Sequence, residues 1–180
     1  MLYRYRECRE KYGSTYKIRK AVNGGVLFKL EEGVYSDTGE EDELEIVQWR
    51  YPKAVMTLES AFFYHGLTDE IPDAYALATE RGSSKIEDSR VRQCFVPVGT
   101  IDIGKTQIEY DGDKVRIYDL ERLVIELARL KTKIPYDLYK EVLESLRKRR
   151  DEIRPDVLQI YLRSFPKRGA IESIIYEELF

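Results

Sequence analysis

The sequence is poor in the residues that build metal centres and disulfide frameworks, since its 180 residues include two cysteines and one histidine. Cys8 and Cys94 stand far apart and form no CxxC spacing, which argues against structural zinc and favours a reducing compartment. The lone His65 cannot form a two-histidine metal site. We therefore predict no metal, no cofactor and a cytoplasmic location.

Signatures of catalysis are also scarce. The patterns GxGxxG, HExxH and GxSxG do not occur, and we expect no phosphate-binding loop either. Acidic residues mostly run together, as at 40–43, which is typical of a solvated linker. For His65, at the end of a predicted helix, contact with free carbonyls is favoured over catalysis. We predict that the chain is not an enzyme and has no catalytic residue.

No apolar run approaches the roughly 20 residues that a helix needs to span a bilayer. The first residues also lack the apolar segment of a secretory signal. We therefore predict no membrane association.

Charge is unevenly distributed along the chain. Residues 1–35 contain eight basic and four acidic side chains, a net charge of +4, whereas the whole chain carries −3 and the remainder therefore −7. A basic arm on an acidic body is expected of a protein that places one end on a polyanion. The alternative is a chance excess of cations on a solvated helix.

The N-terminal pattern predicts two short helices and a hairpin. A helix over 3–12 is broken by Gly13, and Ser14 can cap a second, basic helix over 15–22. Strands at 26–30 and 34–35 flank a turn at 31–33. This order is that of the second half of a winged helix-turn-helix, so residues 1–36 are predicted to form a DNA-binding arm.

The second predicted helix carries the candidate DNA contacts. Such side chains can reach base edges and phosphates from the major groove, and a cation on the hairpin can reach the sugar-phosphate backbone. A solvated basic helix remains the alternative. The candidates are Thr15, Tyr16, Lys17, Arg19, Lys20 and Lys29.

The rest of the chain predicts a larger domain over 44–180, after a linker at 36–43. Strands are expected at 44–49, 74–79, 92–96, 106–110 and 114–118, and a helix capped by Thr57 ends near His65. Asp119 is expected to cap the first of several C-terminal helices. Strands precede helices, so the fold class is α+β: a partial winged helix-turn-helix, a mixed α/β domain and a C-terminal helical segment.

A second basic run closes one of these helices. Favourable charge at a helix C-terminus is the preferred explanation, and a second phosphate-binding patch or a surface for an acidic partner is the alternative. The run consists of Arg147, Lys148, Arg149 and Arg150.

Three stretches of the sequence form a recognisable set: the wing pattern Leu27-x-x-Leu30-x-x-Gly33-x-Tyr35, the run Thr57–Asp69 with Pro72 after it, and Ile117–Leu123. Together they resemble the AbiEi antitoxins, a family of transcriptional regulators of viral defence systems. Small residues in the second stretch, Ser60, Ala61 and Gly66, suggest that it is architectural.

The resemblance implies a two-gene type IV toxin–antitoxin system acting in abortive infection. The antitoxin represses its own promoter by binding double-stranded DNA through the winged helix, and it counteracts a nucleotidyltransferase-like toxin without a stable complex. The second domain would supply antitoxicity and assist DNA binding. The six DNA-contact candidates above correspond to the family's winged helix.

Two departures favour a different function, a toxin-neutralising interaction protein that has lost DNA binding. Family members usually have a further helix before the pair predicted here. Glu31 and Glu32 also occupy the wing tip, where a basic residue is common and where acid would repel phosphate.

Overall fold

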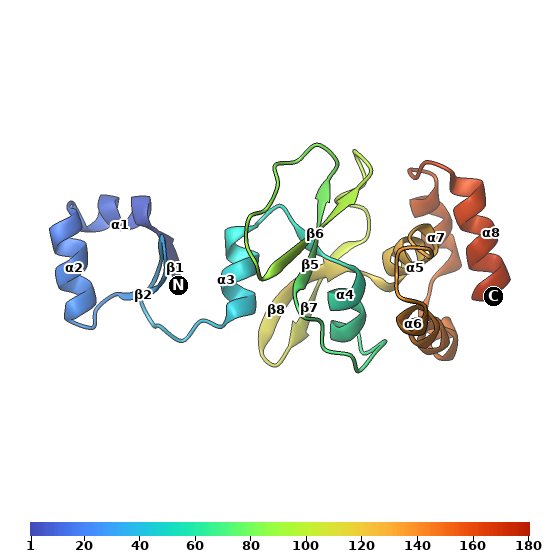
Figure 1. Ribbon diagram of the computed structural model, residues 1–180, viewed down its shortest axis with the longest axis horizontal. Coiled ribbons are helices and arrows are strands. Elements are labelled where there is room, and N and C mark those ends of the chain that lie inside the picture. The colour runs from blue at the N-terminus through green and yellow to red at the C-terminus, as the bar shows by residue number, and fades with distance from the viewer. The chain divides into compact units, whose positions relative to one another are not determined.

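The computed structural model describes all 180 residues, and its internal contacts divide the chain into two compact units, Met1–Pro52 and Lys53–Phe180 (Figure 1). The chain is α+β, as predicted, with eight α-helices and two sheets. None of its helices combines the length and the apolar composition that crossing a membrane requires.

The first unit contains a small antiparallel sheet in the order β1-β3-β2. Two clusters of apolar side chains hold it together: one includes Cys8, Ile18 and Leu27, and the other joins Leu2 and Ile46. Its elements are β1 (Leu2–Arg4), α1 (Tyr5–Tyr12), α2 (Thr15–Asn23), β2 (Phe28–Glu31), β3 (Val34–Ser36) and α3 (Glu43–Arg50).

The helix predicted from residue 3 begins at Tyr5, because Tyr3 and Arg4 pair with β3 as part of β1. The strand predicted at 44–49 is wrong. Those residues form α3, which is capped by Asp42: the Oδ1 of this residue accepts a hydrogen bond from the Glu45 N–H at 2.7 Å.

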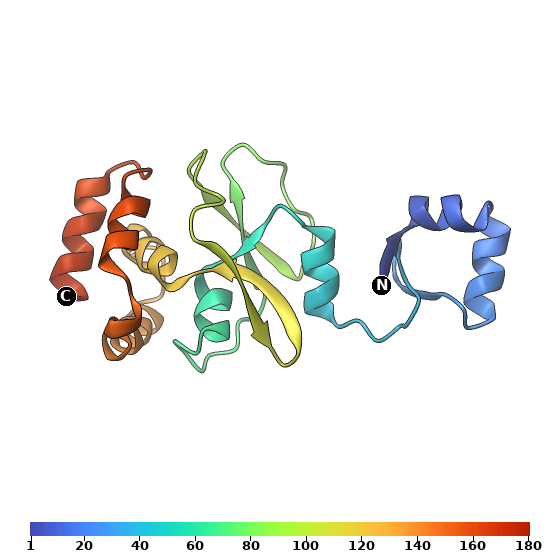
Figure 2. The same ribbon diagram turned by 180° about the vertical axis from the view of Figure 1, so that it is seen from behind.

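The second unit is built on a five-stranded mixed sheet in the order β6-β5-β4-β8-β7 (Figure 2). The pairs β5–β6 and β4–β8 are parallel, and β4–β5 and β7–β8 are antiparallel. Sequence patterns did not predict β4, a fully buried pair of residues at the centre of the sheet. The strands are β4 (Val55–Met56), β5 (Tyr75–Glu80), β6 (Val91–Val96), β7 (Lys105–Tyr110) and β8 (Asp113–Tyr118).

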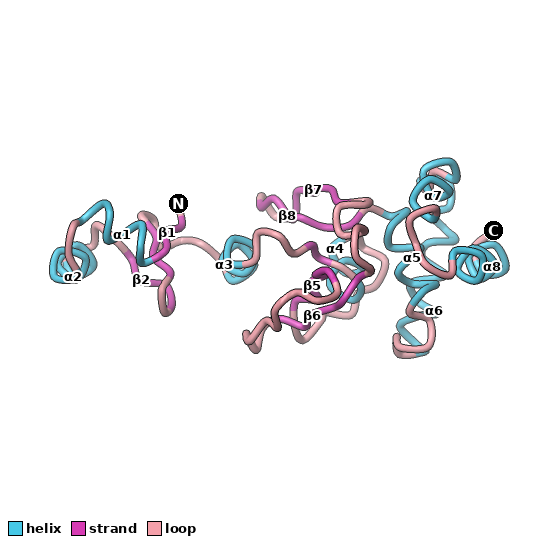
Figure 3. The backbone as a smooth tube through the Cα atoms, turned by 90° about the horizontal axis from the view of Figure 1, so that it is seen from above, coloured by secondary structure: helices cyan, strands magenta, loops and turns pink.

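Helix α5 is the centre of the helical part of this unit and contacts α4, α7 and α8 (Figure 3). Its residues 121–128 are all buried. The helices are α4 (Leu58–Tyr64), α5 (Leu120–Arg129), α6 (Tyr136–Lys148), α7 (Pro155–Leu162) and α8 (Arg168–Glu178), with a 3₁₀ turn at Arg150–Glu152.

Two predicted caps have different outcomes. Asp119 caps α5 as expected, since its Oδ1 accepts a hydrogen bond from the Arg122 N–H at 2.9 Å. Thr57 occupies the N-cap position of α4, but its hydroxyl makes no capping hydrogen bond. The start of α4 therefore depends on burial of Leu58 and Ala61 rather than on the threonine side chain.

Candidate nucleic-acid interface

Helix α2 is amphipathic and is fixed at its start by a sharp turn. Gly13 adopts the left-handed backbone conformation, with φ +82°, and Ser14 accepts a hydrogen bond on Oγ from the Lys17 N–H at 3.3 Å. Ile18 is fully buried, and Ala21 and Val22 are half-buried beside it. The opposite side of the helix is therefore left to polar residues.

The exposed side of α2 carries four of the six predicted contacts, Tyr16, Lys17, Arg19 and Lys20. At roughly 100° per residue, Arg19, Tyr16 and Lys20 lie next to one another on this arc, and Lys17 lies at its far edge. Tyr16 is 75% exposed. The charged groups of Lys17, Arg19 and Lys20 form no ion pair and no hydrogen bond within the protein. All three are therefore available to an anion.

Thr15 has a different role, because its hydroxyl is engaged within the unit. It lies 2.7 Å from the Tyr5 hydroxyl and accepts a hydrogen bond from Arg9 Nη1 at 3.2 Å. The pKa of Tyr5 is lowered by the hydrogen bonds of its hydroxyl with Thr15 and Arg9, and further by the charges of Arg9 and Arg19. Tyr5 and Arg9 were not predicted as site residues, although their spacing of four places them on one face of α1.

The first unit has a hollow of about 390 Å³, whose lining includes Tyr5, Thr15, Arg19 and Lys29. Three predicted contacts therefore line one space: Thr15 and Arg19 from α2, and Lys29 from β2. Arg19 therefore connects the hollow with the exposed arc of α2.

Lys29 is the one predicted contact whose charge is neutralised. Its Nζ forms an ion pair with Glu32 at 2.7 Å, and this carboxylate raises the pKa of Lys29. Glu31, the other acid of the wing tip, pairs with Arg50 at 2.9 Å. The wing therefore presents balanced charge rather than a basic edge.

The second basic run does not form one patch. Arg147 donates to the Glu178 carbonyl oxygen at 2.6 Å, and Arg149 pairs with Glu152 at 2.7 Å and donates to the His65 carbonyl oxygen at 2.6 Å. Only Lys148 and Arg150 are exposed without a side-chain partner.

His65 connects two elements of the second unit. Its Nε2 donates to the Tyr118 carbonyl oxygen at 2.8 Å, which links the end of α4 to the end of β8. Burial lowers the pKa of His65, and nearby Arg149 lowers it further. Since its partner is a backbone carbonyl, this geometry fits a structural role.

The expectation of no phosphate-binding loop overlooked one match to the pattern GxxxxGK[ST]: Gly99–Thr106 reads GTIDIGKT. A phosphate cradle requires this loop to open a helix, but here it leads into strand β7. The amides of Gly99, Thr100, Ile103 and Lys105 are already hydrogen-bonded inside the protein.

The carbonyls of this loop serve a buried arginine instead. Arg122, which is fully buried, donates to the carbonyl oxygens of Thr100 and Ile103, and a Cβ at Gly104 would meet the Arg122 side chain at 2.5 Å. The motif glycine is therefore explained by close packing, without a phosphate. No group of three or more His, Cys, Asp or Glu side chains is placed to hold a metal ion.

Comparison of the chain with models of known protein families gives no match, and comparison with curated proteins gives none.

Proposed function

We propose that the chain is an AbiEi-type antitoxin that binds double-stranded DNA at its own promoter and represses its operon. The observation that carries this proposal is α2, whose buried face anchors it and whose opposite face bears three cations without intramolecular partners. Helices of this kind enter the major groove in helix-turn-helix proteins.

The connectivity of the first unit supports the proposal. A strand, two helices joined by a glycine turn and a hairpin follow in sequence, and β1 pairs with the second strand of the hairpin. A winged helix-turn-helix without its first helix has this order. In that arrangement α2 is the recognition helix and the β2–β3 hairpin is the wing.

The candidate contacts then divide into two roles. Arg19, Lys20 and Lys17 would bind phosphates or base edges, and the exposed Tyr16 lies between the first two on the same surface. Thr15, held by Tyr5 and Arg9, would fix the start of the recognition helix.

The partner in this proposal is a nucleotidyltransferase-like toxin, opposed without a stable complex. The support is the resemblance of Thr57–Asp69 and Ile117–Leu123, both in the second unit. Within Thr57–Asp69, Ser60 is buried. Its hydroxyl donates to the Ala74 carbonyl and accepts from the Ala76 N–H, as expected of an architectural residue.

A mobility-shift titration of the upstream operon region tests the DNA-binding half. The triple variant Lys17→Ala, Arg19→Ala, Lys20→Ala should bind at least about tenfold more weakly, because charge-assisted contacts are lost. The matched control removes three exposed cations of the second unit that lie in no candidate site, Lys53→Ala, Lys85→Ala and Arg163→Ala. Equal loss in both variants, or no binding by the wild type, would reject the proposal.

A toxin-neutralising protein without DNA binding is the second candidate, and the Lys29–Glu32 pair favours it. Residues 1–52 also hold nine basic and ten acidic side chains, so the first unit as a whole has no basic excess. Rescue of cells from the neighbouring toxin by a chain that does not shift the operon DNA would support this candidate.

A further inference from the structure

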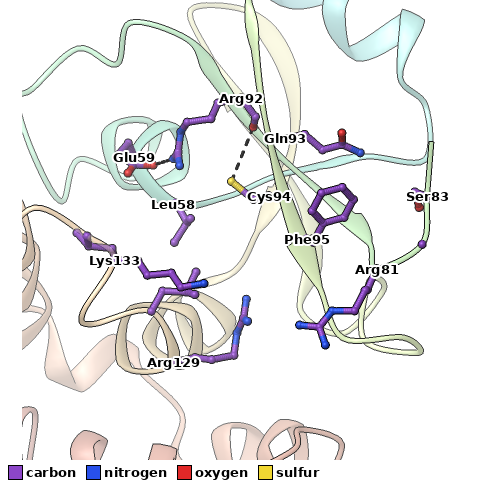
Figure 4. A pocket seen from close by; sticks show the side chains of 13 residues that line it. Leu58, Glu59, Arg81, Ser83, Arg92, Gln93, Cys94, Phe95, Arg129 and Lys133 are labelled. Carbon is purple, nitrogen blue, oxygen red and sulfur yellow. Dashed lines mark hydrogen bonds and ion pairs between the residues drawn. The ribbon is translucent and has the colours of Figure 1, made fainter. Parts of the chain in front are cut away.

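The second unit has a hollow of about 630 Å³ beside the edge strand β6, large enough for a small-molecule ligand. Four cations line it, Arg81, Arg92, Arg129 and Lys133, together with a single carboxylate, that of Glu59. In Figure 4, Arg92 and Cys94 lie on one side of strand β6 and Phe95 lies on the other. The five charged side chains come from four separate segments of the sequence, so folding creates this charge cluster.

Pairing within the protein neutralises only part of this charge. Arg92 pairs with Glu59, and Arg129 pairs with Glu126. Glu126 is shared, because it also binds Arg122 at 3.0 Å. With the buried Arg122 included, five cations therefore share the two carboxylates of Glu59 and Glu126. Figure 4 draws no hydrogen bond or ion pair from Arg81 or Lys133 to the other lining residues.

The remaining side chains give the hollow an apolar wall. Phe95 is 45% exposed although it is a large aromatic residue, and Leu58, Leu130 and Ile134 also line the space. Exposed aromatic rings next to arginines provide stacking surfaces for bases, and the cations suit phosphates.

We propose that this hollow, the β6 pocket, binds a nucleoside di- or triphosphate. Arg81 and Lys133 contact the phosphate chain, Arg129 adds charge behind them, and the ring of Phe95 stacks on the base. The β6 pocket lies wholly within the second unit, and it is separate from the loop Gly99–Thr106, whose amides are occupied. The proposal does not depend on DNA binding by α2.

Titration calorimetry on the full chain tests the proposal with four magnesium-free probes: ATP, GTP, pyrophosphate and adenosine. We expect at least one nucleotide to bind with one-to-one stoichiometry and about tenfold or more tighter than pyrophosphate, and adenosine not to bind. No nucleotide binding, or equal affinity for pyrophosphate, would overturn the proposal.

Three variants locate the site. Arg81→Ala with Lys133→Ala should weaken nucleotide binding about tenfold or more, and both side chains are exposed, so the variant should fold. Phe95→Ala should reduce nucleotide affinity to that of pyrophosphate. Arg163→Ala, which removes an exposed cation outside the β6 pocket, should change nothing.

The same variants separate this site from a DNA surface. If the Arg81→Ala, Lys133→Ala variant loses affinity for operon DNA while the wild type binds no nucleotide, the cations serve nucleic acid and the proposal fails. Loss of nucleotide binding with unchanged DNA binding supports it, whatever the outcome for α2.

Discussion

Arg122 shows how one side chain can hold the second unit together. Its guanidinium is fully buried, lies over the rings of Tyr118 and Phe165 at 4.2 and 4.7 Å, and pairs with Glu126. It also donates to two loop carbonyls. A buried arginine with this many partners connects β8, α5, the Gly99–Thr106 loop and the segment after α7.

Arg122→Met should lower the free energy of unfolding by about 3–5 kcal/mol, since the buried Glu126 carboxylate loses one of its two arginine partners and the Ile103 carbonyl loses its donor. Urea denaturation followed by circular dichroism measures the change. Arg163→Met, at an exposed position, is the control. A loss below about 1 kcal/mol would mean that the buried pair does not stabilise the fold.

His65 should make the stability of the second unit depend on pH. Burial holds its folded-state pKa below the usual 6.5, so the unfolded chain takes up a proton first as the pH falls. Stability is therefore retained above pH 6.5 and declines as the pH falls from there through the lowered pKa.

The His65→Gln variant isolates this effect, because the amide can still donate to the Tyr118 carbonyl but does not titrate. Urea midpoints measured between pH 7.5 and 5.5 should fall more for the wild type than for the variant. Parallel curves would show that the histidine contributes nothing to the pH dependence.

At the scale of single elements, local signals predicted those helices that have a clear cap or period. Helices α2 and α5 are capped by Ser14 and Asp119, as expected. Strands β1 and β4, of three and two residues, were missed because so short a segment has no measurable periodicity. Leu44 and Ile46 alternate as in a strand, yet the cap at Asp42 and burial of Val47 favour the helix α3.

The candidate sites also differ in how far local sequence patterns could predict them. The cations of α2 could be predicted because they share one helix with a visible apolar face. The Lys29–Glu32 pair and the Tyr5–Thr15–Arg9 contacts could not, since they depend on turn geometry. The β6 pocket gathers residues from four distant segments, and no local pattern signals it.

Helix α3 offers a test of its cap. Asp42→Ala should destabilise the first unit by about 1 kcal/mol, because the hydrogen bond to the Glu45 N–H and the favourable charge at the helix start are lost. The only tryptophan, Trp49, lies on α3, so its fluorescence reports unfolding of this unit. Glu40→Ala, outside the helix, should leave the transition unchanged.

At the scale of the whole molecule, the chain divides into two compact units, and both apolar clusters of the first unit consist of residues from 1–52 alone. The fragment 53–180 contains the complete five-stranded sheet and α4–α8. Expressed alone, it should unfold in a single cooperative transition measured by circular dichroism. A fragment that lacks cooperative unfolding would show that the second unit needs the first.

The measurement that most directly tests DNA binding by α2 is a salt titration of binding to the upstream operon region, followed by fluorescence anisotropy. Released counterions should give a slope of log K against log salt of about −3 or steeper, and the Lys17→Ala, Arg19→Ala, Lys20→Ala variant should flatten it by about 2 to 3. Binding that does not respond to salt, or a slope that the variant leaves unchanged, would contradict the account.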